Sequence, residues 1–144
     1  MVKKIWFDMD GTIANLYADP EWLAKLRASD PTPYQTAKPM VNMSLLARYL
    51  HKAQRLGYEV GIVSWLSKGS DKEYDLAVSG AKIEWLRKHL PSVEWNEIKI
   101  VAYGTPKHEL CEGILFDDEL YNRLAWGVGA YEPSEIMHVL RGLA

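Results

Sequence analysis

The chain has 144 residues, of which 48% are hydrophobic and 25% charged, and these proportions fit one folded domain with a buried core. Its formal net charge is −2 and it has no basic block, so the composition gives no indication of nucleic-acid binding. Its apolar runs are too short to span a membrane, and its N-terminal segment lacks the pattern of a signal peptide. Cys111 is the only cysteine, so an internal disulfide is excluded. We therefore expect a single cytoplasmic domain over residues 1–144, with no membrane association.

Short apolar stretches rich in β-branched residues predict the strands of a sheet. The predicted strands are residues 4–7, 59–63, 98–101 and 114–116, with a further candidate at 126–130. The first four stretches are continuously apolar, which is typical of strands that are covered on both faces of a parallel sheet.

Helical patterns separate these strands. The predicted helices span residues 45–56 and 70–89, and two more begin near residues 119 and 134. Gly57 is a typical stop for the first helix, Ser70 is the expected N-cap of the second, and Pro91 follows the end of the second. This alternation of strands and helices predicts a layered α/β fold.

Residues 15–41 do not fit the alternation. They contain four prolines and one short helix candidate, with Asp19 as its N-cap and Pro20 in its first turn. Connections of this length between a strand and a helix are commonly functional. We therefore expect residues 15–41 to form a small cap over the ends of the strands.

Each of the four main strands is followed by polar residues that suit phosphate or metal chemistry. In chain order these residues are Asp8 and Asp10, Ser64, Lys107, and Asp117 and Asp118. Ligands of open α/β sheets bind at the carboxyl ends of the strands, so we expect these side chains to form one site.

The first acid pair suits covalent catalysis of phosphoryl transfer. Asp8 is the expected nucleophile, because a carboxylate can attack phosphorus and form an aspartyl-phosphate. Asp10 is the expected acid and base, which protonates the leaving oxygen and then activates a water molecule.

The remaining residues are expected to hold the phosphate and a metal ion. Gly11 allows the backbone to turn tightly and approach the phosphate. The expected phosphate-binding side chains are Thr12, Ser64 and Lys107. Asp117 and Asp118 would complete a site of hard oxygen ligands for Mg²⁺, whose charge offsets the crowded carboxylates.

Several aromatic residues are candidates for the core or for substrate binding. Trp6, Trp85 and Trp126 lie on strand or helix patterns and are expected in the core. Trp65 directly follows Ser64 and is a candidate to contact the substrate. Trp22 and Tyr34, in the predicted cap, are candidates for the same role.

At these residues the sequence resembles the haloacid dehalogenase (HAD) superfamily of phosphohydrolases. FDMDGT matches its nucleophile motif DxDGT, Ser64 matches the second motif, Lys107 the third, and the acid pair in LFDD the fourth. The motifs occur in the order of the family and span residues 5–118. The resemblance implies a Rossmann-like three-layer α/β/α sandwich around a mainly parallel sheet, with a minimal cap.

The resemblance also implies a ligand set and a subfamily. Mg²⁺ would be bound by Asp8, by the backbone carbonyl of Asp10 and by Asp117, while Asp118 would support the site without touching the metal. The short interval between Lys107 and Asp117 leaves room for a short helix at most, which is similar to the 5′(3′)-deoxyribonucleotidase branch.

The sequence therefore predicts a Mg²⁺-dependent phosphatase that hydrolyses phosphate monoesters. Its substrate remains open between a nucleotide, a sugar phosphate and a phosphorylated macromolecule. One alternative is a phosphotransferase with the same covalent step, although a small cap favours hydrolysis; another is a non-catalytic phosphate-binding module. A receiver-like signalling domain is disfavoured because the lysine here precedes the second acid pair. A small cap leaves the site open to closure by a second copy of the chain, so a homo-oligomer is a further possibility.

Overall fold

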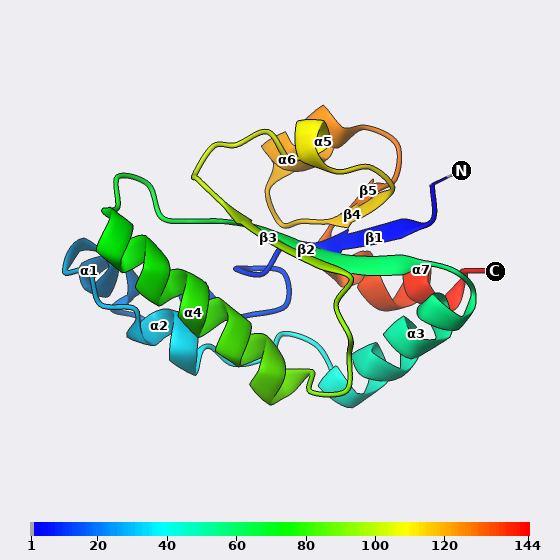
Figure 1. The fold of residues 1–144 in the computed structure, drawn as a ribbon, viewed down its shortest axis with the longest axis horizontal. Coiled ribbons are helices and arrows are strands. Elements are labelled where there is room, and N and C mark those ends of the chain that lie inside the picture. Colours follow the sequence, from blue (N-terminus) through cyan, green and yellow to red (C-terminus); the bar gives the residue numbers. More distant parts are fainter. Residues whose placement is uncertain (1) are drawn as a thin grey trace.

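A five-stranded parallel sheet forms the centre of the computed structural model, which describes residues 2–144 (Figure 1). Its strands are β1 (Lys4–Phe7), β2 (Glu59–Trp65), β3 (Glu97–Val101), β4 (Ile114–Phe116) and β5 (Ala130–Tyr131). Their order in the sheet is β3-β2-β1-β4-β5, and every pairing is parallel. The four main predicted strands are confirmed. The predicted fifth strand at 126–130 is largely wrong, because residue 126 still belongs to a helix and the strand begins at residue 130.

The helices follow the predicted alternation. They are η1 (Leu16–Ala18), α1 (Trp22–Arg27), α2 (Thr32–Thr36), α3 (Met43–Arg55), α4 (Lys72–His89), α5 (Lys107–Leu110), α6 (Leu120–Trp126), η2 (Pro133–Glu135) and α7 (Ile136–Arg141). Gly57 has φ +93° just after α3, as expected of a helix stop. The N-cap of α4 is Asp71 and not Ser70, because the Asp71 carboxylate accepts a hydrogen bond from the Tyr74 N–H at 2.8 Å. Within residues 2–144, no helix has the length and apolarity to cross a membrane.

Helices cover both faces of the sheet and give three layers (Figure 1). On one face, Phe7 and Phe116 belong to a buried cluster with residues of α3, α7 and the second half of α4. On the other face, Trp6 and Leu115 pack with Cys111 and with the partly buried Trp126 at the end of α6. The three-layer α/β/α sandwich is thereby confirmed, and the core status of Trp6 follows from its 3% exposure.

Strand β3 departs from the expectation that all four main strands are covered on both faces. It lies at one edge of the sheet, and its residues are half-buried or exposed, with Ile98 at 37%. Lys99 also interrupts its apolar residues, so the expected cover on both faces is wrong for β3.

Residues 15–41 form η1, α1 and α2 and pack beside α4 (Figure 1). Their contact is a small buried cluster consisting of Leu16, Tyr34, Tyr74, Val78 and Ala81. Helix α1 itself buries no residue, and it begins at Trp22 and not at the predicted Asp19. Asp19 instead accepts a hydrogen bond from the Glu21 N–H at 2.9 Å and pairs with Lys25 at 3.0 Å. The part of this segment with the weakest attachment to the core is thus α1.

Candidate active site

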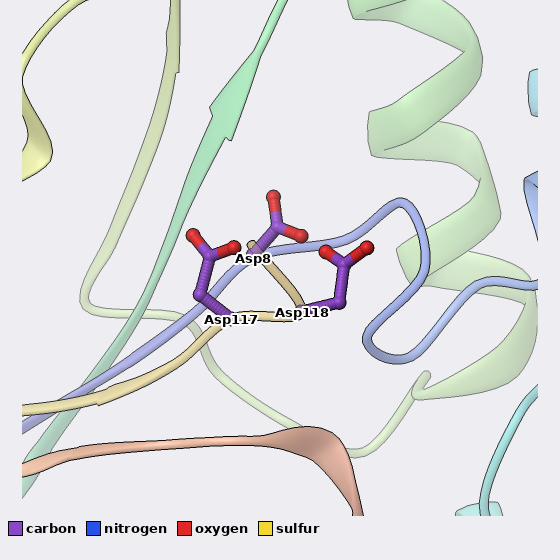
Figure 2. A group of neighbouring side chains, drawn as sticks. All are labelled: Asp8, Asp117 and Asp118. Carbon is purple, nitrogen blue, oxygen red and sulfur yellow. The ribbon is translucent and has the colours of Figure 1, made fainter. Parts of the chain in front are cut away.

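Three predicted acids converge where β1 and β4 end. Asp8 directly follows β1, and Asp117 and Asp118 directly follow β4, its neighbour in the sheet. Figure 2 shows their carboxylates pointing to the same side, and one oxygen of each lies within 4.8 Å of the others. The predicted meeting of the two acid pairs follows from the parallel pairing of these two strands.

Lys107 is the cation that holds two of these acids together. Its Nζ donates hydrogen bonds to Asp8 Oδ1 at 3.0 Å and to Asp117 Oδ2 at 2.7 Å, and the residue is only 2% exposed. Burial lowers the pKa of Lys107, but the two carboxylates raise it more, so the net pKa lies above its usual value. Lys107 therefore carries a positive charge beside Asp8. It is the first residue of the four-residue α5, so the short interval between Lys107 and Asp117 holds only one turn of helix before β4.

The two acids after β4 differ in their surroundings. Asp117 is 0% exposed; its Oδ1 accepts from the Glu119 N–H at 2.9 Å, and its Oδ2 accepts from Lys107 and from Asn122 Nδ2 at 3.2 Å. Asp118 lines the cavity in front of the site. Asp117 is thus the buried partner of Lys107 and Asp118 the acid that faces the cavity; we therefore propose Asp118 as a direct metal ligand, whereas the family resemblance implies Asp117.

The acid cluster fits a small hard cation. Burial raises the pKa of both Asp117 and Asp118; the charge of Asp8 adds to this rise at Asp117, and a hydrogen bond with Asp8, together with its charge, adds to it at Asp118. Carboxylate oxygens are the ligands that Mg²⁺ prefers, and a divalent ion would offset the repulsion that Lys107 alone leaves uncompensated. Asp8, Asp117 and Asp118 each offer a carboxylate oxygen within 4.8 Å of the others, close enough to share such an ion.

A metal-binding test separates the two possible roles of the acids after β4. We expect Mg²⁺ to stabilise the wild-type protein by about 1–3 kcal/mol when it is well above its dissociation constant, since it binds only the folded site. Asp118→Asn is expected to abolish the Mg²⁺-induced rise in melting temperature. Asp117→Asn is expected to lower the melting temperature in the absence of metal but to retain the Mg²⁺-induced rise. Thermal unfolding with EDTA and with Mg²⁺ measures both effects, and the opposite pattern would assign the ligand role to Asp117.

Gly11 and Thr12 shape the turn after Asp10. Gly11 has φ +80°, and a side chain at this position would collide with the Asp118 carboxylate and crowd the Tyr17 ring. The predicted need for glycine therefore arises from both backbone conformation and space. Thr12 Oγ1 donates to Asp8 Oδ2 at 2.9 Å and accepts from the Asp118 N–H at 3.2 Å. Its hydrogen can be donated to Asp8 Oδ2, with Asp118 Oδ1 at 3.4 Å as a second acceptor, and Thr12 does not line the cavity. The contact between Thr12 and phosphate stays a prediction.

Lys82, on α4, is a site residue that the sequence analysis missed. It is 1% exposed, and its Nζ donates to Asp10 Oδ2 at 3.0 Å, to Ser64 Oγ at 2.6 Å and to the Trp65 carbonyl at 2.8 Å. The sequence did contain a pattern that predicts its burial: Lys82 follows Val78 by four residues and therefore lies on the buried face of α4. An ammonium only donates hydrogen bonds, so the hydrogen of the Ser64 hydroxyl stays free for another acceptor.

Asp10 lies between the cavity and Lys82. Burial raises the pKa of Asp10, the Lys82 ammonium lowers it, and the neighbouring Asp8 charge raises it; the net shift is upward. A carboxyl group with a raised pKa spends more time protonated, which suits donation of a proton to a leaving group.

A cavity of about 570 Å³ opens in front of these residues. Of the predicted site residues, those that line it are Asp8, Asp10, Trp65, Lys107 and Asp118, whereas Gly11, Thr12, Ser64 and Asp117 do not line it. The other aromatic residues in its walls are Tyr17, Trp22, Tyr34 and Tyr103. Two aromatic contacts build the walls: Tyr17 meets Trp22 at 5.0 Å between ring centroids, and Trp65 meets Tyr103 at 5.2 Å. Trp65 is also fixed by its Nε1, which donates to the Thr105 carbonyl at 2.8 Å.

Comparison with known proteins bears on the fold. No family model matches the sequence, and no curated protein matches it. Among solved structures, a D,D-heptose 1,7-bisphosphate phosphatase from Burkholderia thailandensis is similar, with a TM-score of 0.52 and 16% sequence identity. The match covers 86% of this chain and 71% of that chain. Together with the parallel sheet and the helices on both of its faces, this likeness shows that the chain has the HAD-like, Rossmann-type fold predicted from its motifs.

Proposed function

We propose that this protein is a Mg²⁺-dependent phosphatase that hydrolyses phosphate monoesters through an aspartyl-phosphate on Asp8. The observation that carries the proposal is that Asp8 lines the cavity together with the acid Asp10 and accepts a hydrogen bond from the buried cation of Lys107. A structural ion pair alone would not need a second acid, a second buried lysine and an open cavity at the same strand ends.

The contacts of Asp8 support its role as the nucleophile. Lys107 and Thr12 each donate a hydrogen bond to one of its two oxygens, so the carboxylate is held in one orientation where it lines the cavity. In the first step an Asp8 oxygen would form a bond to phosphorus while the bond from phosphorus to the ester oxygen breaks. Asp10 would supply the proton that the departing oxygen needs.

The second step would return the protein to its starting state. Asp10, now deprotonated, would accept a proton from a water molecule as that water attacks phosphorus, and the bond between phosphorus and Asp8 would break. When bound between Asp8 and Asp118, Mg²⁺ would supply positive charge against the negative charge of the phosphoryl group. Lys107, and the free hydroxyl hydrogen of Ser64 if the substrate reaches it, would hold phosphoryl oxygens.

The cavity walls bear on the choice of substrate. Aromatic side chains line the space in front of the acids. Their planar rings suit a leaving group with a planar base, as in a nucleotide, better than a polyhydroxylated leaving group, as in a sugar phosphate. We therefore place a nucleotide first among the candidate substrates. A sugar phosphate, a phosphorylated macromolecule, phosphotransfer to another acceptor and phosphate binding without chemistry are the alternatives.

Phosphate release from a panel of monoesters tests this function directly. The panel contains nucleoside 5′- and 3′-monophosphates and sugar phosphates, each incubated with Mg²⁺ and with EDTA. We expect release that requires Mg²⁺ and is fastest with a nucleotide. Release that is fastest with a sugar phosphate would overturn the nucleotide assignment. Absence of release from every member, with phosphate binding retained, would favour the non-catalytic module.

Lys82 provides a further prediction. We expect Lys82→Met to lower kcat by about 10²-fold, because Asp10 and Ser64 lose the donor that fixes both of them. Lys82→Arg is expected to recover little activity, since a larger guanidinium does not fit a site that is 1% exposed. Steady-state kinetics, with circular dichroism to check folding, measure the effect. An unchanged kcat in a folded Lys82→Met variant would remove Lys82 from the proposed mechanism.

A further inference from the structure

Two exposed cations line the cavity away from the acid cluster. Arg27 lies at the end of α1, and Lys68 lies in the loop between β2 and α4. In the described part of the chain, residues 2–144, neither side chain forms an ion pair with a carboxylate. Lys25, on the same short helix as Arg27, is by contrast paired with Asp19 and Glu21. The positive charge of Arg27 and Lys68 is thus left free at the cavity wall.

The two segments that carry these cations are tied to each other. Tyr34 and Ser67 share a hydrogen bond of 2.9 Å between their hydroxyl groups, which joins the segment after α1 to the residue before Lys68. Tyr74 Oη also donates to the Asp30 carbonyl at 3.5 Å, just beyond the end of α1. We call this junction, formed by residues 27–34 and 66–70, the cationic seam.

The carboxylates close to the seam have other partners. Asp30 accepts from the Thr32 N–H at 2.9 Å and from the Thr32 hydroxyl, and Asp71 accepts from the Tyr74 N–H at 2.8 Å. Asp75 accepts a short hydrogen bond from the Ser70 hydroxyl. These bonds satisfy local turns and helix ends, and they leave the two cations available to an anion from outside the chain.

We infer that the cationic seam is a second anion subsite, which selects phosphate monoesters whose leaving group carries another phosphate. This inference rests on the proposed function, because it assigns the scissile phosphate to the acid cluster. The aromatic walls then hold the body of the substrate between the cluster and the seam. A second hollow of about 280 Å³ shares Lys68 and Tyr103 with the cavity wall, so there is open space beside Lys68, although Arg27 lines only the main cavity. Guanidinium and ammonium groups both bind phosphate through charge-assisted hydrogen bonds.

Binding of matched ligands tests the subsite without relying on turnover. Asp8→Asn serves as the background, because it is expected to bind substrates without hydrolysing them. The ligand pairs are a nucleoside 5′-monophosphate with its 3′,5′-bisphosphate, and glucose 1-phosphate with glucose 1,6-bisphosphate, measured by titration calorimetry. We compare Arg27→Gln, Lys68→Gln, the double variant and the control Lys72→Gln. Lys72 is exposed at the start of α4 and does not line the cavity.

We expect the bisphosphate of at least one pair to bind more tightly than its monophosphate. Each seam variant should then weaken bisphosphate binding about five-fold, and the double variant about 20-fold, as is typical of partly exposed charge-assisted contacts. Monophosphate binding should change less than about two-fold, and Lys72→Gln should leave both ligands unaffected, since screened distant charges contribute little. Equal losses for both ligands, losses equal to those of Lys72→Gln, or no preference for either bisphosphate would overturn the subsite.

Failure of the subsite can be distinguished from failure of the proposed function. If the wild-type protein releases no phosphate while the seam variants weaken only bisphosphate binding, the subsite stands and the hydrolase proposal fails. If the wild-type protein hydrolyses monophosphates and bisphosphates with equal kcat/KM, and the seam variants leave both values unchanged, the hydrolase proposal stands and the subsite is wrong.

Discussion

Asp8→Asn is expected to reduce Mg²⁺-dependent phosphate release by about 10⁴-fold or more, because the amide cannot serve as the nucleophile that the proposed covalent step requires. The substitution keeps the size of the side chain at a position that is 7% exposed, so the fold should be retained. It also removes one of the crowded negative charges beside Asp118, and although Lys107 loses its pairing with Asp8, it keeps its second carboxylate partner, Asp117, at 2.7 Å. The measurement is phosphate release from the best substrate of the panel.

Two further measurements make the Asp8 result specific. Glu109→Gln is the matched control, since it makes the same chemical change on the exposed surface of α5, two residues after Lys107, and it should retain activity within about two-fold. Rapid quenching with a radiolabelled substrate should trap phosphate on the wild-type protein and not on Asp8→Asn. An Asp8→Asn variant with wild-type activity would rule out the aspartyl-phosphate, whatever the substrate.

Lys107→Met is expected to abolish activity and to lower the free energy of unfolding by about 3–5 kcal/mol, the usual cost of removing one partner from a buried ion pair. The reason is that Asp8 and Asp117 share this one ammonium, at 3.0 and 2.7 Å, in a site where the lysine is 2% exposed. Without it, two buried carboxylates would face each other uncompensated. Urea denaturation in EDTA measures the loss of stability without interference from metal binding.

A control and a double variant sharpen the Lys107 test. Lys99→Met removes a lysine whose ion pair with Glu97 spans 3.5 Å at the more exposed edge strand, and it should cost less than about 1 kcal/mol. Combining Lys107→Met with Asp117→Asn should recover part of the lost stability, because one of the two unpaired charges is then gone. If Lys107→Met costs no more than Lys99→Met, the buried ion pair does not contribute as the structure suggests.

The sequence determined those features that depend on short-range pattern. Apolar runs next to the chemistry-bearing residues located the four main strands, and DMDGT with LFDD placed the acids at strand ends. The helix stop at Gly57 and the limited length of the helix between Lys107 and Asp117 were also readable, because both follow from local backbone chemistry and spacing. Helix starts were less predictable, as the N-cap of α4 shows: Ser70 and Asp71 can both cap, and the competing bond from Ser70 to Asp75 leaves Asp71 as the cap.

Only the tertiary structure decided which distant side chains meet. Lys82 contacts Asp10, 72 positions away in the sequence, and Lys107 contacts Asp8, 99 positions away, so no local pattern predicts either contact. The different surroundings of the adjacent Asp117 and Asp118 likewise arise from the partners that α5 and α6 bring to one of them. The cationic seam exists because α2, which contacts α1, is joined to the loop before α4 by the hydrogen bond between Tyr34 and Ser67. Local propensity locates strands and helices. The protonation of the site's acids, their ion pairs and their access to the cavity depend instead on side chains from distant segments, which only the packed fold brings together.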